Sequence, residues 1–153
     1  HVLDSTEDEW RSVEDELRVL NDYVALQELR FSNHLQIRWF GRDRTWDRIA
    51  CPPMLFLPLL DNAVRASAER LMQGPLEIEV RCGLENEHFV LTISVHTFLA
   101  SYGQMNSALL DVNERVRLAF GELAYCDERV ILGSSGRQLA MILSFPAMER
   151  ENG

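Results

Sequence analysis

The spacing of hydrophobic side chains switches several times along the chain between a helical and a strand period. A repeat every three or four residues predicts amphipathic helices, and alternation with polar residues predicts strands. The order helix, strand, helix, hairpin, helix, hairpin indicates an α+β fold. We expect a two-layer α/β sandwich whose mostly antiparallel sheet is covered on one face by helices. The predicted helices are 12–31, 54–72 and 109–120, and the predicted strands are 35–39, 76–82, 89–95, 129–132 and 138–145.

Capping residues and breakers agree with these helices. Ser12 followed by Asp15 predicts a capping box at the start of the first helix. Pro58 lies within the first turns of the second helix, where its missing N–H costs least, and Gly74-Pro75 ends that helix.

Length and charge limit the function classes. The 153 residues suffice for one domain with a core, which we place at 12–146. Residues 1–11 are expected to be a linker from upstream helices or an added segment, and 147–153 a polar tail. The net charge of −9 and the scattered arginines argue against nucleic acid and anionic lipid as partners.

No apolar run approaches the roughly 20 residues that a membrane span needs, and no signal peptide is present. Because the chain opens abruptly at His1, we expect a piece of a longer protein whose membrane segments lie elsewhere. The three cysteines (Cys51, Cys82 and Cys126) form no CxxC pair. They are therefore interpreted as buried apolar residues in a reducing, cytosolic setting.

Several charged and aromatic residues have structural interpretations. The acidic run 14–16 is expected on a solvated helix face. Asp111 and Arg115 are spaced for an i,i+4 ion pair, and His96 is expected at the surface or in the core rather than as a base. The tryptophans are expected to pack against the first helix, with an interface to missing upstream helices as the alternative for two of them. The three tryptophans are Trp10, Trp39 and Trp46, and the alternative of an interface applies to Trp10 and Trp46.

The second predicted helix carries an Asp-Asn pair whose side chains are suited to binding a metal ion. A hard cation such as Mg²⁺ takes oxygen ligands, and the side-chain carbonyl of Asn62 offers one. Asn62 lies about 200° around the helix from Leu60 and is expected to face away from the buried stripe. Asp61 could orient a water or an attacking group. Arg65, one turn later, could pair with Asp61 or approach a phosphate.

Four parts of the sequence contain groups of residues that are typical of one protein family. The first part is 16–35, with Glu16-Leu17, Tyr23, 28–31 and Leu35. The second is 51–65, where Cys-Pro-Pro-Met-Leu precedes Leu-Pro-Leu-Leu-Asp-Asn-Ala-Val-Arg. The third is 111–121, and the fourth is Phe145-Pro146. Together they resemble the C-terminal ATP-binding domain of sensor histidine kinases of the LytS and YehU type. The segment 57–65 resembles the N-box of that family. The resemblance covers residues 12–146 and implies the Bergerat (GHKL) ATPase fold shared with gyrase, Hsp90 and MutL.

The resemblance also implies cofactors, site residues and partners. ATP and Mg²⁺ are the cofactors, with the metal ion on Asn62 and Asp61 at the catalytic position where the family usually has Glu. Arg65 and Arg115 are the other expected nucleotide contacts. The implied partners are the upstream dimerisation helices with the phosphoaccepting His and a response regulator, of the LytTR type as one alternative. The full-length protein would be a homodimer and this domain cytoplasmic, the cytosolic part of a membrane-bound sensor.

The nucleotide motifs depart from the family pattern in three places. The family's Asp-x-Gly is replaced within 94–99, which reads Ser-Val-His-Thr-Phe-Leu, so the acid for adenine and the glycine are missing. The glycine-rich lid is replaced at 104–109 by Gln-Met-Asn-Ser-Ala-Leu. The N-box continues as Arg65-Ala66-Ser67 instead of Lys-His-Gly. These changes predict impaired nucleotide binding.

Two functions remain open at the level of the sequence. In the first, the chain is the ATP-binding domain of a histidine kinase, in which ATP phosphorylates a His outside this chain and the phosphoryl group passes to a response regulator. In the second, it is a non-catalytic pseudokinase module that acts in regulation or protein docking. Retention of Asn62 favours the first, and the lost acid and glycines favour the second.

Overall fold

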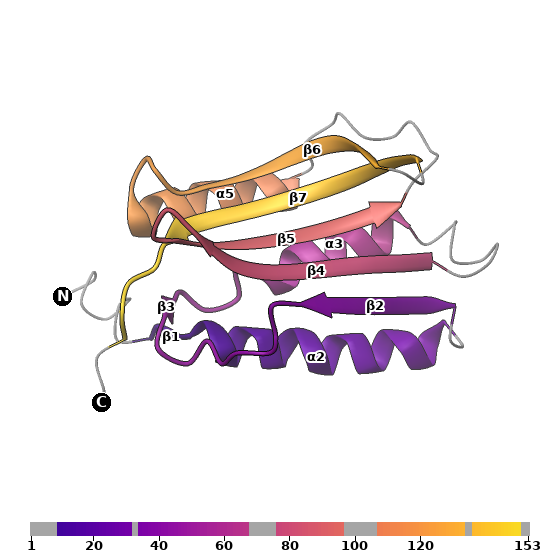
Figure 1. The fold of residues 1–153 in the computed structure, drawn as a ribbon, viewed down its shortest axis with the longest axis horizontal. Helices are drawn as coiled ribbons and strands as arrows, with labels where there is room; N and C mark the ends of the chain where they lie inside the picture. Colours follow the sequence, from indigo (N-terminus) through magenta and orange to yellow (C-terminus); the bar gives the residue numbers. More distant parts are fainter. Residues whose placement is uncertain (1–8, 32–33, 68–75, 97–106, 134–135, 151–153) are drawn as a thin grey trace.

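A five-stranded mixed sheet forms the centre of the protein in a computed structural model, which describes residues 9–31, 34–67, 76–96, 107–133 and 136–150. Helices α3 and α5 lie behind this sheet, and α2 runs beside β2 (Figure 1). The predicted α+β sandwich is confirmed. The helices are α2 (Val13–Arg30), α3 (Leu57–Ala66) and α5 (Ser107–Phe120), and the strands of the sheet are β2 (Leu35–Phe40), β4 (Leu76–Glu85), β5 (His88–His96), β6 (Tyr125–Gly133) and β7 (Gly136–Pro146).

The strands follow the order β2-β4-β5-β7-β6. Only the β2–β4 pair is parallel in this sheet, and the other three pairs are antiparallel. The registers place apolar residues on one face, as with Ile93, which lies opposite Val80 on β4 and Met141 on β7. All three side chains are buried, because this face packs against the helices.

The β4–β5 hairpin turns through two residues with left-handed backbone conformation, Asn86 at φ 51° and Glu87 at φ 66°. Two such residues form the turn whose twist matches that of the flanking strands. Both predicted hairpins are present, but the strands of the second are longer than their alternating residues indicated.

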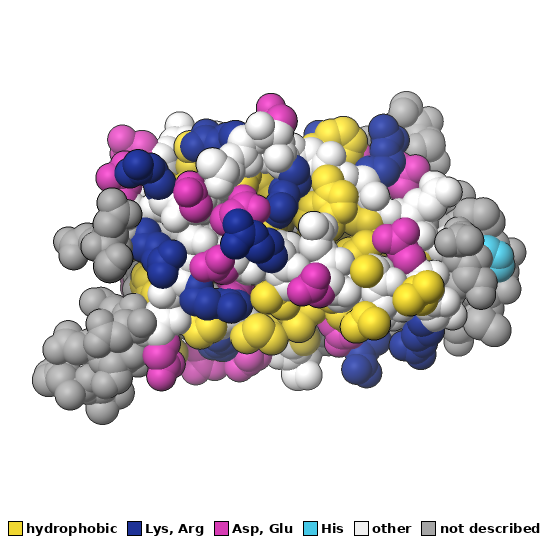
Figure 2. All heavy atoms as spheres, turned by 90° about the horizontal axis from the view of Figure 1, so that it is seen from below, with side chains coloured by type: hydrophobic (Ala, Val, Ile, Leu, Met, Phe, Trp, Pro, Cys, Tyr) yellow, Lys and Arg dark blue, Asp and Glu magenta, His cyan; other side chains and the backbone are white. Residues whose placement is uncertain are grey.

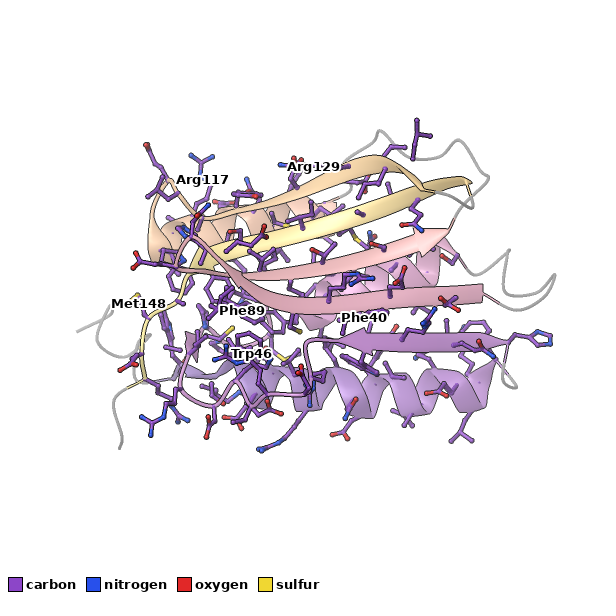
Figure 3. All side chains as sticks on the ribbon, viewed as in Figure 1. Phe40, Trp46, Phe89, Arg117, Arg129 and Met148 are labelled. Carbon is purple, nitrogen blue, oxygen red and sulfur yellow. The ribbon has the colours of Figure 1, made fainter. Side chains whose placement is uncertain are left out.

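The core joins all three helices to the sheet. Trp46, in the segment after β2, packs edge-on against Phe89 of β5 with ring centroids 5.1 Å apart (Figure 3). Trp10 packs instead on Phe120 of α5, with centroids 5.1 Å apart. Trp46 belongs to the same buried core cluster as Leu17 and Leu20 of α2, as expected, and its backbone N–H donates to Glu14.

The start of α2 agrees with the prediction, and the start of α3 does not. The capping box at α2 is confirmed, because the Ser12 side chain accepts from the backbone of Asp15 and the Asp15 side chain accepts from that of Ser12. The prediction that the second helix begins at residue 54 is wrong. Met54 has φ 62°, which no right-handed helix contains, and α3 begins at Leu57 with Pro58 in its first turn. The helix was predicted to run to residue 72, whereas α3 ends at Ala66 with Ser67 as its C-cap; residues 68–72 lie outside the described residues.

A small second sheet was not predicted. It pairs β1 (Arg11–Ser12) with β3 (Ala50–Cys51) in antiparallel fashion and thereby ties the start of α2 to the segment before α3. Two-residue strands are too short to produce a detectable alternation.

The surface on the α2 side mixes both signs of charge. Figure 2 shows arginine and acidic side chains interspersed with apolar patches there, without a basic stripe. In the part of the chain that the structure describes, no helix is both long and apolar enough to cross a membrane.

Candidate functional site

The Asp-Asn pair lies in the middle of α3, and its two members face different neighbours. Asp61 points towards α2, where its Oδ1 accepts a hydrogen bond from the Tyr23 hydroxyl at 2.7 Å. Its other oxygen, Oδ2, accepts from Nε of Arg65 at 2.8 Å. The pairing of Arg65 with Asp61 is therefore present, and both carboxylate oxygens have a donor.

Tyr23 remains a donor over the physiological pH range. Burial raises its pKa above the usual value for tyrosine, and the hydrogen bond to Asp61 raises this pKa further. Because the neutral phenol is retained, the contact between α2 and α3 persists at neutral pH.

Asn62 turns towards the sheet. Its Nδ2 lies 3.5 Å from Sδ of Met141, a fully buried residue of β7. The expectation that Asn62 faces away from the buried stripe is thus only partly met, since the side chain is half-buried. Helix α3 contacts α2, α5 and the sheet, so positions next to its buried stripe, such as Asn62, are partly covered.

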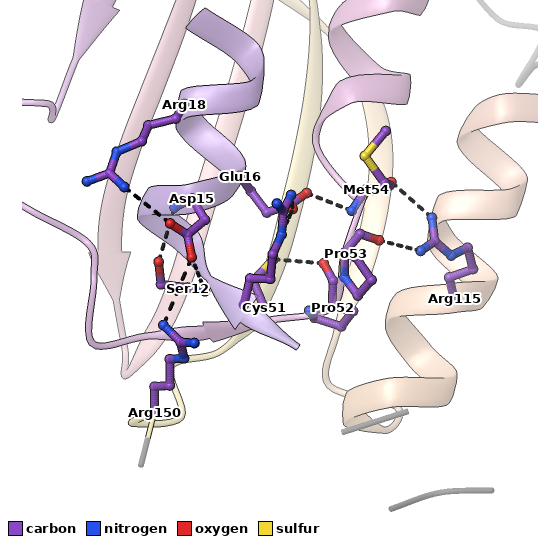
Figure 4. A network of polar contacts seen from close by, with 11 residues as sticks. Ser12, Asp15, Glu16, Arg18, Cys51, Pro52, Pro53, Met54, Arg115 and Arg150 are labelled. Atoms are coloured by element: carbon purple, nitrogen blue, oxygen red, sulfur yellow. Dashed lines mark hydrogen bonds and ion pairs between the residues drawn. The ribbon is translucent and has the colours of Figure 1, made fainter. Parts of the chain in front are cut away.

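Arg115 contacts the segment that leads into α3. Its Nη1 donates to the carbonyl of Met54 at 3.0 Å and its Nη2 to that of Pro53 at 2.7 Å (Figure 4). The expected ion pair with Asp111 is not among the contacts of the described residues. A nucleotide contact of Arg115 stays a prediction and would compete with these two carbonyls.

The N–H of Met54 is held from the other side by Glu16 of α2. This carboxylate accepts from Met54 N at 2.7 Å and forms an ion pair with Arg11. Met54 is therefore bonded at its N–H and at its carbonyl, by Glu16 and Arg115 respectively, which fixes the left-handed turn before α3.

The expectation of a solvated acidic run is wrong for two of its three residues. Glu16 is 1% exposed and Glu14 is 9% exposed. Glu14 accepts from the backbone N–H of Trp46 and from Arg42, each at 3.0 Å. Burial of these carboxylates is tolerated because each has a cationic partner and a backbone donor.

The cysteines are buried and unpaired, as expected. Burial raises the pKa of the Cys82 and Cys126 thiols to about 12, and it raises the pKa of Cys51 well above the usual value. Thiols with raised pKa values are poor nucleophiles, which supports their interpretation as apolar core residues.

Several predicted features lie outside the described residues. These are 97–99 of the segment that replaces Asp-x-Gly and 104–106 of the altered lid, and also the side chain of His96. Within the described ranges, no group of three or more His, Cys, Asp or Glu side chains is arranged to hold a metal ion.

Sequence reasoning missed Tyr23, Glu16 and Met141 as neighbours of the site. Tyr23 precedes its partner Asp61 by 38 residues, and Met141 follows Asn62 by 79. No local periodicity links positions that far apart, so only the packing of α2, α3 and β7 brings them together.

The sequence matches no protein-family model and no curated protein. Solved structures are similar to it. The histidine kinase AdeS of Acinetobacter baumannii has a TM-score of 0.61 at 12% identity, over 90% of this chain and 67% of that chain. A nucleotide-free catalytic domain of histidine kinase ThkA has 0.57 at 9% identity, over 92% and 99%. The histidine kinase domain of the E. coli osmosensor EnvZ has 0.55 at 13% identity, over 95% and 92%.

These likenesses extend over nine-tenths or more of this chain at low identity, so they concern the architecture rather than individual side chains. The chain has the fold of histidine kinase catalytic domains.

Proposed function

We propose that the chain is the ATP-binding domain of a two-component sensor histidine kinase, of the LytS type, with weakened nucleotide binding. The observation that carries this proposal is the position of Asn62. In a fold of this class, it lies on α3 with its amide Nδ2 towards β7, between helix and sheet. The domain would act with upstream dimerisation helices of a homodimer and with a response regulator, as the cytosolic part of a membrane-bound sensor.

The residues of α3 fit Mg²⁺ and nucleotide in part. The carbonyl oxygen of Asn62 is the ligand type that Mg²⁺ prefers, and one such protein ligand suffices when phosphates supply the others. The bound nucleotide would supply the phosphoryl group for the histidine. Arg65 uses Nε on Asp61, and its mostly exposed guanidinium offers further donors to a phosphate.

Asp61 fits a catalytic role less well. A carboxylate that accepts from Tyr23 and from Arg65 must give up one of these bonds before it can orient a water or an attacking group. This arrangement, together with the replaced Asp-x-Gly and lid glycines, favours the second candidate function, a pseudokinase module that docks other proteins without catalysis.

Titration with a fluorescent ATP analogue, with and without Mg²⁺, separates the two functions. We expect weak, saturable binding that requires Mg²⁺ and is weakened about tenfold or more by Asn62→Ala, which removes a ligand worth at least about 1.4 kcal/mol. Asn21→Ala, at an exposed position of α2, is the matched control and should change nothing. Absence of binding at millimolar nucleotide would overturn the kinase function in favour of the pseudokinase.

A further inference from the structure

Strand β6 forms one edge of the sheet, and its two halves differ. It is last in the strand order and, among the strands that the structure describes, it pairs with β7 alone. The first half carries charges at Asp127, Glu128 and Arg129, the last of which is labelled on β6 in Figure 3. The second half is apolar and exposed, with Val130 at 45%, Ile131 at 42% and Leu132 at 80%.

Side chains cap the outer edge of the first half. The N–H of Cys126 donates to the Asn113 side chain of α5 at 2.9 Å, and the N–H of Glu128 donates to the side chain of Asp127 at 2.9 Å. These side chains accept from N–H groups that would otherwise be free to donate to the carbonyl groups of an added strand.

The second half has no such cap among the described residues. In an antiparallel ladder, the N–H and C=O of one residue point to the same side, and this side alternates along the strand. Because the N–H of Cys126 and of Glu128 points outwards, the N–H and C=O of Val130 and Leu132 point outwards too. Those groups and the exposed side chains form a short open edge, Val130–Leu132.

We propose that this open edge pairs with the same edge of a second copy of the chain, antiparallel about a twofold axis at Ile131. Val130 then lies opposite Leu132 of the second copy, and the two residues exchange both of their outward hydrogen bonds. The axis generates this pair twice, so four backbone hydrogen bonds form. The sheets become one ten-stranded sheet with the helices of both copies on the same side.

Charges and caps select this register. A twofold axis at Arg129 would place two guanidinium groups opposite each other, and an axis at Glu128 would place two carboxylates opposite each other. An axis at Val130 would require the N–H of Glu128, which Asp127 already satisfies. The axis at Ile131 uses both open positions and keeps the charged halves of the two strands apart.

Sedimentation of the chain over a range of concentrations tests the pairing. We expect the apparent mass to rise from 17.6 kDa towards twice that value, and Ile131→Arg to hold it at 17.6 kDa. Leu118→Arg, at an 80% exposed position of α5, is the matched control and should dimerise like the wild type. Circular dichroism establishes that each variant is folded.

Disulfide crosslinking tests the register. At the twofold axis, residue 131 of one copy lies directly opposite residue 131 of the other. The Cβ atoms of two Ile131→Cys copies therefore lie about 4.5–5.5 Å apart. In Arg129→Cys, the two thiols lie four residues apart along the strands, about 13 Å, and cannot bridge. We therefore expect mild oxidation to crosslink Ile131→Cys and not Arg129→Cys.

Three results would overturn the proposal. The first is a wild type that stays monomeric at millimolar concentration, which would leave the edge to a strand of another protein. The second is a dimer that survives Ile131→Arg. The third is equal crosslinking at positions 129 and 131.

Discussion

Asp61 is held by two donors that come from different helices. Tyr23 of α2 and Arg65 of α3 each bind one carboxylate oxygen. A residue chosen from its motif for catalysis is thereby part of the contact between two helices. Both of its interactions can be measured through the stability of the fold.

Replacement Tyr23→Phe should lower the free energy of unfolding by about 1–2 kcal/mol at pH 7, because a hydrogen bond to a charged acceptor is lost. The pKa of Tyr23 is raised in the folded state, so the unfolded chain releases this proton first. The stabilisation is therefore complete below the usual tyrosine pKa of about 10 and declines as the pH rises above it.

Urea unfolding at a series of pH values from neutral to strongly alkaline measures this effect. The difference between wild type and Tyr23→Phe should stay constant up to about pH 10 and then narrow. The buried cysteines are common to both proteins and cancel in the difference. A difference that grows above that pH would contradict the assignment.

Glu14 and Glu16 show why residue type alone misleads. Three consecutive acids at the start of a helix indicate a solvated face, because unpaired carboxylates are rarely buried. Their burial depends on Arg42, on Arg11 and on two backbone donors from the chain beyond β2. None of these partners can be identified before the chain has folded.

At the level of the elements, the end of β2 depends on a close approach to β4. Gly41 has φ 88°, and a Cβ built on it would lie 2.0 Å from the carbonyl oxygen of Cys82. Both the backbone conformation and the space exclude a side chain there.

Replacement Gly41→Ala should lower the free energy of unfolding by about 3 kcal/mol or more, since backbone atoms of β2 and β4 must move apart. The measurement is urea unfolding monitored by tryptophan fluorescence. Gly83→Ala is the matched control, because a Cβ at Gly83 meets nothing within 4 Å. That control should be neutral or stabilising by up to about 1 kcal/mol. Equal losses in both variants would refute the role of close approach.

Element types were predictable from the sequence, but some boundaries were not. The capping box of α2 is local and was found from Ser12 and Asp15. The start of α3 at Leu57 depends on the left-handed Met54, which Glu16 and Arg115 hold from two other helices. A boundary fixed by distant partners leaves no signal in the residues next to it.

At the scale of the whole molecule, each copy of the chain carries a net charge of −9. Two copies that meet at β6 therefore repel one another, and salt screens this repulsion. The Debye length, over which charges interact, falls from about 10 Å at 0.1 M salt to about 3 Å at 1 M. We expect the proposed dimer to become tighter as sodium chloride is raised, as measured by sedimentation equilibrium. A dimer that weakens with salt would indicate attractive ion pairs and would contradict the uncharged contact at Val130–Leu132.

The order of helices and strands, both hairpins, the burial of the cysteines and the Asp-Asn pair on a helix were all predictable from the residues alone. Each of these follows from periodicity or from residues within one turn, which act through local backbone preferences. Three contacts became visible only in the folded protein: Asp61 faces Tyr23, Asn62 faces Met141, and Arg115 holds the turn before α3. Those contacts depend on how α3 is oriented between its neighbours, and this orientation is set by packing of the entire core.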